Sequence, residues 1–196
     1  MPKALLIIDY TNDFVATNGA LTCGQVAQDL APTIIDLADS FLAAGDYVIL
    51  PTDCHHLNDS YHPENKLFPP HNIEGTWGQE FYGPLNDWYQ AHQDSENVYA
   101  FAKNRYSSFQ NTNLDNYLRS RQITDLTLSG VCTDICVLHT AVSAYNLNYQ
   151  LTIPKKAVAS FDANGHDWAL NHFKTCLGAK LIYIKKRLSQ NSTSFY

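Results

Sequence analysis

Two cysteines stand four residues apart in the segment SGVCTDICVLHT, at Cys132 and Cys136. Free cysteine is among the most buried residue types, so two small core residues are the simplest interpretation. The alternatives are a disulfide, half of a metal site and a catalytic nucleophile. Thr133 suits the N-cap of a following helix, and Cys136 would then lie in the first turn, where the positive helix end favours a thiolate. The segment therefore predicts a candidate nucleophile at Cys136.

Other reactive side chains stand where apolar runs end. Asp9 follows KALLII, Asp53 follows YVIL and Lys103 follows VYAF. Parallel strands present their carboxyl ends at one edge of a sheet, where α/β proteins place their chemistry, so we expect these side chains to converge. A carboxylate beside a thiol can accept its proton, and an ammonium group can stabilise the thiolate. Attack of such a thiol on a carboxamide would release ammonia and leave a thioester, which water then cleaves.

The rest of the chain predicts the elements that position these residues. Short apolar runs indicate six strands, at 3–8, 47–50, 98–101, 126–128, 151–153 and 180–183. Apolar spacings of three and four, together with a polar helix before the fourth strand, predict helices over about 26–44, 113–121, 135–145 and 167–177. This alternation predicts an α/β fold, a three-layer α/β/α sandwich around a mostly parallel six-stranded sheet.

The stretch from about 52 to 96 departs from this pattern, with little periodicity and many Pro, Gly, His and Asn residues. A structureless segment of that length in a compact domain is usually a functional loop or a wrong assignment. A histidine-rich surface loop is the simpler interpretation. Asp53 and His55 are two apart at a strand end, so extended geometry would point both to one side. With Glu64 and His71 they form an oxygen and nitrogen set suited to Zn²⁺, Mn²⁺ or Fe²⁺, in which His62 or His56 could replace Glu64.

Composition bounds the class of protein. The 196 residues suit one domain, which we place at 1–188 with the metal-binding loop at about 52–96 and a polar tail at 189–196. A net charge of −6 without a basic run argues against nucleic-acid binding. No apolar stretch approaches the roughly 18 residues that span a membrane, and the N-terminus reads as a strand rather than a signal peptide. Five scattered cysteines predict reduced thiols and a cytoplasmic protein.

Four segments together carry a family resemblance: ALLIIDYTNDF, DCHHLNDSYHPENKLFPPHN, AKNRYSSF and SGVCTDICV. In this order and at these spacings they resemble the isochorismatase-like cysteine hydrolases, and more narrowly the nicotinamidase/pyrazinamidase group. The resemblance extends from Lys3 to about Leu181. It implies the Rossmann-like, isochorismatase-type fold.

The resemblance also implies roles for the residues. Asp9, Lys103 and Cys136 would form the catalytic triad, with Asp9 as general base and Cys136 as nucleophile. The peptide bond between Val131 and Cys132 would be cis, and the backbone N–H groups of Cys132 and Cys136 would form an oxyanion hole. The side chain of Cys132 would then be dispensable.

The family's substrate site implies a second set of residues. One divalent metal, zinc first and manganese or iron otherwise, would be held by Asp53, His55, Glu64 and His71. The metal would anchor the pyridine nitrogen and position the carboxamide carbon at the nucleophile. The ring would lie between aromatic side chains, namely Phe14, Phe68 and Tyr106.

The expected function is hydrolysis of nicotinamide to nicotinate and ammonia in NAD salvage, with pyrazinamide as a side substrate. Alternatives are an amidase for carbamoyl or ureido compounds, an isochorismatase, a non-catalytic metal-binding domain, and a metal-hydroxide hydrolase in which Cys136 is structural. The expected partners are small-molecule substrates and a possible second copy of the chain, with neither nucleic acid nor membrane.

Overall fold

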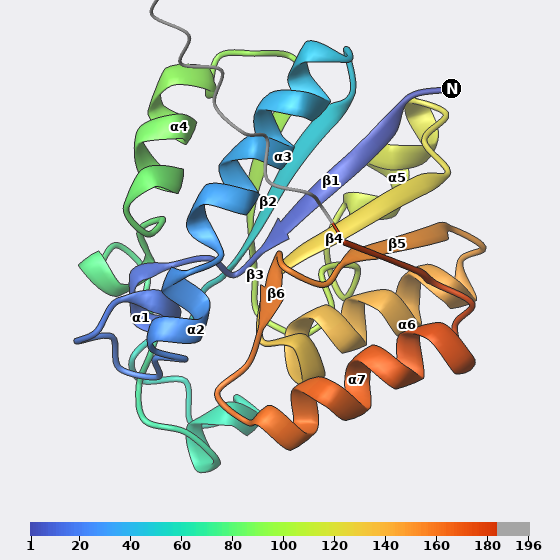
Figure 1. Ribbon diagram of the computed structural model, residues 1–196. Coiled ribbons are helices and arrows are strands. Elements are labelled where there is room, and N and C mark those ends of the chain that lie inside the picture. Colours follow the sequence, from blue (N-terminus) through green and yellow to red (C-terminus); the bar gives the residue numbers. More distant parts are fainter. Residues whose placement is uncertain (184–196) are drawn as a thin grey trace, which may run out of the picture.

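The computed structural model describes residues 1–183 and has a parallel sheet at its centre, with strands in the order β3-β2-β1-β4-β5-β7 (Figure 1). These strands are β1 Lys3–Ile8, β2 Tyr47–Asp53, β3 Val98–Lys103, β4 Asp125–Val131, β5 Gln150–Pro154 and β7 Lys180–Ile182. Every pairing between them is parallel. The six predicted strands are therefore confirmed. A seventh, the two-residue β6 (Val158–Ala159), pairs with β4 and escaped the prediction.

Helices cover both faces of this sheet. They are α1 Asn12–Val15, α2 Gln25–Gln28, α3 Ala31–Ala43, α4 Pro84–His92, α5 Leu114–Ser120, α6 Leu138–Asn146 and α7 Ala163–Thr175. Figure 1 shows α3 and α4 on one side, with α6 and α7 on the other. No helix among residues 1–183 is long and apolar enough to cross a membrane.

The alternation of side chains along β1 explains the three layers. Leu6 packs in one buried cluster with residues of α5, α6 and α7, whereas Leu5 and Ile7 pack in another with residues of α2, α3 and α4. A strand buried on both faces has an uninterrupted apolar sequence, which is what KALLII provides. The predicted three-layer sandwich is confirmed.

Helix boundaries differ from the prediction where side chains and turns decide them. The expected helix at 26–44 is two helices, α2 and α3. The end of α3 follows the prediction: Gly45 adopts a φ of +75°, and its N–H and that of Asp46 donate to carbonyls of the last turn. The Thr133 N-cap prediction is wrong. Cys132 occupies the cap position before a five-residue π-helical segment, Thr133–Val137, which continues into α6.

The segment at 52–96 is less irregular than predicted, because α4 begins at Pro84 and two short 3₁₀ turns, Pro63–Lys66 and Trp77–Gln79, interrupt the rest. One isolated bridge, between Thr11 and Phe81, attaches it to the segment after β1, and a second, between His55 and Ile73, closes it on itself. The irregular part therefore ends near residue 83. The predicted tail at 189–196 lies outside the described residues.

Candidate active site

The sheet brings Asp9, Lys103 and Cys136 together from three places in the sequence. Asp9 follows β1, Lys103 ends β3, and Cys136 lies just beyond β4 in the π-helical segment. The Nζ atom of Lys103 is 2.8 Å from Oδ2 of Asp9 and 3.8 Å from Sγ of Cys136. All three residues are buried. The predicted convergence at the carboxyl ends of the strands is therefore present.

Backbone contacts fix the orientation of the two charged groups. Asp9 has a φ of +53°, a left-handed conformation that aspartate tolerates better than most residues. Its Oδ1 atom accepts a hydrogen bond of 2.8 Å from the N–H of Asp53. Lys103 donates to the carbonyl oxygen of Arg105 at 3.1 Å, and strand pairing sets it beside Asp53. Asp9 and Lys103 are therefore held by the sheet itself.

Burial controls the charge states of these groups. It raises the pKa of Asp9 to about 6, although the Lys103 ammonium opposes the rise. Burial also raises the pKa of the Cys136 thiol well above its usual range, again against the effect of Lys103. For Lys103 burial would lower the pKa, but the carboxylate of Asp9 and the thiol of Cys136 outweigh it and the pKa rises.

The resting site therefore holds a protonated thiol, a charged ammonium and a carboxylate that ionises near neutral pH. The helix start was expected to stabilise a Cys136 thiolate. Burial and the carboxylates of Asp9 and Asp53 disfavour the negative charge on that sulfur more strongly, so the pKa is raised instead. A buried carboxylate with a pKa near 6 is suited to accept the thiol proton when a reaction requires it.

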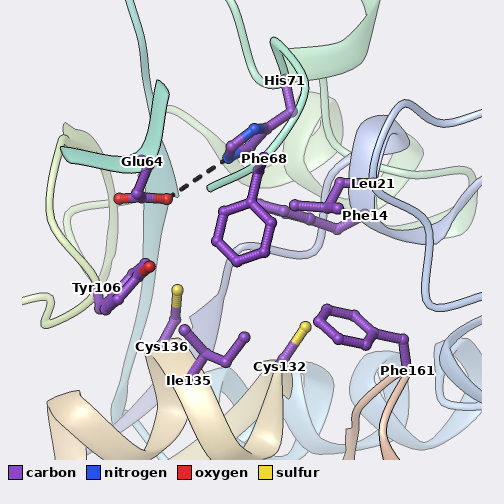
Figure 2. A pocket seen from close by; sticks show the side chains of 10 residues that line it. All are labelled: Phe14, Leu21, Glu64, Phe68, His71, Tyr106, Cys132, Ile135, Cys136 and Phe161. Atoms are coloured by element: carbon purple, nitrogen blue, oxygen red, sulfur yellow. Dashed lines mark ion pairs between the residues drawn. The ribbon is translucent and has the colours of Figure 1, made fainter. Parts of the chain in front are cut away.

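A small cavity opens beside Cys136 (Figure 2). Ten residues line it: Phe14, Leu21, Glu64, Phe68, His71, Tyr106, Cys132, Ile135, Cys136 and Phe161. The three predicted substrate aromatics, Phe14, Phe68 and Tyr106, are all among them. In Figure 2 the sulfur atoms of Cys132 and Cys136 point toward the cavity, which has Glu64 and His71 on the opposite side.

Sequence reasoning missed three of the lining residues. Phe161 follows β6, so the short apolar run AVA before it was the available signal for another strand end. Ile135 lies inside the cysteine motif and was assigned only to a helical stripe. Leu21 lies in an irregular stretch, and no pattern in the sequence marks it.

The predicted metal ligands also come together. Asp53, His55, Glu64 and His71 are buried, and each offers one ligand atom within 4.8 Å of the others. Oδ2 of Asp53 is 2.7 Å from Nε2 of His55 and 3.6 Å from Nε2 of His71, which is also 3.6 Å from Oε2 of Glu64. Two imidazoles and two carboxylates in this arrangement can hold a divalent metal ion.

His71 carries the clearest sign that the cluster suits a cation. Its Nδ1 lies 2.8 Å from the carbonyl oxygen of Pro69, a contact that turns Nε2 toward the other ligands. That Nε2 atom is buried without a hydrogen-bond partner among the described residues. Burial would lower the pKa of His71, but Asp53 and Glu64 raise it to about 10, so a metal ion must displace a proton there.

The hydrogen bonds of His62 and His56 decide between the candidate ligands. Both ring nitrogens of His62 are engaged, one with the carbonyl oxygen of Asn104 at 2.8 Å and one with the N–H of Glu64 at 3.3 Å. His56 is exposed and lies 3.2 Å from Glu74. The geometry therefore favours Glu64 over either histidine.

Asp13 holds the loop that carries these ligands. Its two carboxyl oxygens accept hydrogen bonds from the N–H groups of Ala20 and Asn72, at 3.0 and 2.7 Å. Thr11 donates to the side chain of Asn72 at 2.9 Å. A buried carboxyl group thus ties the segment after β1 to the residue that follows His71. The peptide bond between Val131 and Cys132 is cis, as the resemblance implied.

Comparison with known proteins gives a consistent result. A family model described as Isochorismatase domain matches residues 3–183. An isochorismatase family protein, PncA of Bacillus subtilis, is 54% identical over 181 residues, which cover 92% of this chain and 99% of that protein. A crystal structure of the nicotinamidase/pyrazinamidase PncA from Bacillus subtilis has a TM-score of 0.90 at 54% identity, with the same coverage. The pyrazinamidase/nicotinamidase of Streptococcus mutans has a TM-score of 0.90 at 48% identity and covers 92% of this chain and 99% of its own.

Proposed function

The chain belongs to the isochorismatase family, and from this premise we propose that it is a nicotinamidase that hydrolyses nicotinamide to nicotinate and ammonia in NAD salvage. Pyrazinamide, with a ring of nearly the same shape, is a second substrate. Relatives named nicotinamidase/pyrazinamidase support this choice at 54% and 48% identity.

One observation carries the proposal. A single cavity is lined by Cys136, by aromatic side chains, and by two members of the candidate metal cluster, Glu64 and His71. A flat heteroaromatic carboxamide fits this combination, because its ring needs apolar walls and its ring nitrogen needs a cation or donor. Its carboxamide carbon must then lie at a nucleophile. Figure 2 shows Cys136 facing the side of the cavity formed by Glu64 and His71.

The first half of the reaction uses the triad. The carboxylate of Asp9 accepts the proton of the Cys136 thiol, and the sulfur attacks the carboxamide carbon. Lys103, 2.8 Å from Asp9 and 3.8 Å from the sulfur, keeps positive charge beside both groups while the proton moves. The proton on Asp9 then passes to the leaving nitrogen, ammonia departs, and a thioester to Cys136 remains.

The second half returns the enzyme to its starting state. Asp9, again ionised, accepts a proton from water as the water oxygen attacks the thioester carbon. The sulfur leaves and takes up the proton from Asp9, and the acid is released and loses its proton to solvent to give nicotinate. In both halves the backbone N–H groups of Cys132 and Cys136 would hold the negative carbonyl oxygen.

Asp53, His55, Glu64 and His71 would hold one divalent ion, for which we propose Zn²⁺. Such an ion would supply an electrophilic anchor for the ring nitrogen. Phe14, Phe68 and Tyr106 would enclose the ring, and burial raises the pKa of the Tyr106 hydroxyl to about 12, so that it stays a neutral donor.

We also infer the surroundings of the enzyme. All five cysteines are free thiols, which suits the reducing cytoplasm. The partners are small molecules, and a homo-oligomer is compatible with exposed aromatic residues such as Trp77 and Trp168. We assign no role to nucleic acid or membrane. We propose a single domain at 1–188 and a tail at 189–196.

The test is ammonia release from nicotinamide by the purified, zinc-loaded protein, beside Cys136→Ala and a sample treated with EDTA. Release that disappears in both controls supports a cysteine amidase that needs its metal. Release lost only with the chelator would contradict the thioester. No ammonia release from nicotinamide, together with activity on N-carbamoyl compounds, would contradict the substrate assignment.

A further inference from the structure

Cys23 and Cys132 place their sulfur atoms 3.3 Å apart, although 109 positions separate them in the sequence. Both residues are buried, with 8% and 5% of their surface exposed. It is the only hydrogen-bonding contact between two thiols among the described residues, which include all five cysteines. The proposed reaction uses neither thiol group, because it needs only the backbone of Cys132.

We propose that Cys23 and Cys132 are a dithiol modification site, which small peroxides oxidise to an intramolecular disulfide that suppresses turnover. A disulfide has a sulfur–sulfur distance of about 2.05 Å, so the sulfurs have to approach by roughly 1.2 Å. Because the two residues already touch, side-chain rotation with a small backbone adjustment can supply that movement. The effect on turnover rests on the proposed function, whereas the disulfide does not.

The substrate cavity gives an oxidant its route to the pair. Cys132 lines the cavity together with Cys136, and its sulfur points into it in Figure 2. Hydrogen peroxide has only two heavy atoms, so it is small enough to enter this cavity. Cys23 packs with Cys132 in the same buried cluster, so it is in place to react with whatever forms on its neighbour.

The chemistry balances with peroxide as the sole co-reactant. The Cys132 thiolate attacks one peroxide oxygen, the O–O bond breaks, and a sulfenic acid and a hydroxide form; the hydroxide takes up the thiol proton to give water. The Cys23 sulfur then attacks the sulfenic sulfur, the S–S bond forms, and the hydroxyl group leaves with the Cys23 proton as a second water. Two thiols lose two electrons, and one peroxide is reduced to two waters.

The rate should be slow. The hydrogen bond with Cys23, together with burial, raises the pKa of the Cys132 thiol well above its usual range, so little thiolate is present at neutral pH. The disulfide should therefore form under sustained exposure to peroxide and not during brief exposure. A buried disulfide, once formed, would persist until a reductant reaches it.

The backbone of Cys132 connects the disulfide to catalysis. Its carbonyl oxygen accepts hydrogen bonds from the N–H groups of Ile135 and Val137, at 3.1 Å each, in the segment that carries Cys136. Movement of Cys132 toward Cys23 would displace its own N–H, one of the two proposed oxyanion donors. A displacement of about 1 Å at a reacting centre can cost on the order of 10²-fold in rate.

The experiment uses the full-length protein. Wild type is treated with hydrogen peroxide, remaining thiols are blocked with N-ethylmaleimide, and peptides are mapped by mass spectrometry without reduction. We expect a cross-linked pair of peptides containing Cys23 and Cys132. We also expect kcat/KM for nicotinamide to fall as the cross-linked fraction rises, to at least tenfold below the untreated value when cross-linking is complete. Dithiothreitol should restore it.

Two variants make the test specific. Cys23→Ala should release ammonia like the wild type before treatment and give no cross-link after it, with Cys23→Ser as a substitute if the alanine variant is unstable. Cys176→Ala removes an exposed cysteine outside the cavity and should behave as wild type throughout.

A treated wild type in which Cys132 is found only as a free thiol, or only bound to Cys136, would overturn the proposal. A complete cross-link with unaltered turnover would overturn its inhibitory half. Because the peptide map needs no activity, a cross-link in a protein silent on nicotinamide would leave the dithiol standing and contradict the proposed function alone.

Discussion

The triad and the metal cluster meet at one cavity but are positioned in different ways. Asp9 and Lys103 lie at the ends of β1 and β3, which both pair with β2, so continuous backbone pairing fixes their register. Glu64 and His71 lie on an irregular segment that is attached by one isolated bridge and a few side-chain hydrogen bonds. Asp9 and Lys103 thus belong to the sheet at the core of the domain, as does the ligand Asp53, whereas the other ligands Glu64 and His71 belong to the irregular segment.

This difference indicates which part of the site should tolerate change. Replacing Cys136 removes chemistry and should leave the fold intact, because the sheet positions Asp9 and Lys103 independently of it. A substitution among the loop residues should alter chemistry and local order together, because those side chains are also what holds the loop in place. Each measurement below tests one side of this contrast.

The largest effect should come from Cys136→Ala. Loss of the nucleophile should reduce ammonia release by about 10⁴-fold or more, the order seen when a hydrolase loses its attacking group. Single-turnover kinetics and a urea unfolding curve measured together check it. The contrast requires an unfolding midpoint close to that of the wild type. A large loss of stability would indicate that the triad also holds the fold together.

The second largest effect should come from loss of a metal ligand on the loop. Glu64→Ala and His71→Ala should each weaken metal binding by roughly 10²-fold or more, because even an indirect partner of a metal ligand costs 10–100-fold. Elemental analysis of the purified protein measures the effect. His62→Ala and the exposed His56→Ala should retain the metal. Full loading in Glu64→Ala with loss in His62→Ala would reverse the ligand assignment.

The acidic side of the pH profile should show a smaller effect from the triad. Burial raises the pKa of Asp9 from 3.8 to about 6, so the base becomes protonated as the pH falls through that value. Below it kcat/KM should fall by about tenfold per pH unit. A divalent ion at the neighbouring Asp53 would lower the pKa of Asp9, so the loaded enzyme should show its limb at or below pH 6. A limb above pH 7 would contradict Asp9 as the base.

The smallest effect should come from Asp13→Asn, which replaces an acceptor of two backbone hydrogen bonds. We expect a loss of about 1 kcal/mol in stability, the typical net value of one such bond, and a rise of a few-fold in KM with kcat unchanged. Asp115→Asn is the matched control, because its partner Arg119 is exposed. A reduced kcat in Asp13→Asn would show that the loop also positions the triad.

The sequence allowed prediction of the sheet and of the residues at its edge, because strand ends in a parallel sheet converge whatever joins them. It did not allow prediction of β6, since two residues are too short to show a periodicity. Phe161, which follows β6, was missed with it. Leu21 was missed because tertiary hydrogen bonds, such as that from its own N–H to the carbonyl oxygen of Asp13, fix its position.

Two other errors came from interactions that only the folded chain reveals. Thr133 is a favourable N-cap by residue type, but its hydroxyl lies 2.8 Å from Nδ1 of His166 instead. The helix start was expected to favour a thiolate at Cys136, yet burial beside two carboxyl groups dominates. The preference for Glu64 over His62 as a metal ligand was not an error, but the hydrogen bonds of His62 that support it also appear only in the folded chain.

The position of β1 has a consequence for how the protein matures. Among the described strands β1 is made before the others, yet it lies in the middle of the sheet, between β2 and β4, and Ile8 pairs with Gly130. During translation the edge of β1 that faces β4 stays unpaired until Asp125–Val131 has been made. Contacts so distant in sequence slow folding and expose strands that can aggregate. The nascent enzyme should therefore be inactive and dependent on chaperones until residues beyond Cys136 have left the ribosome.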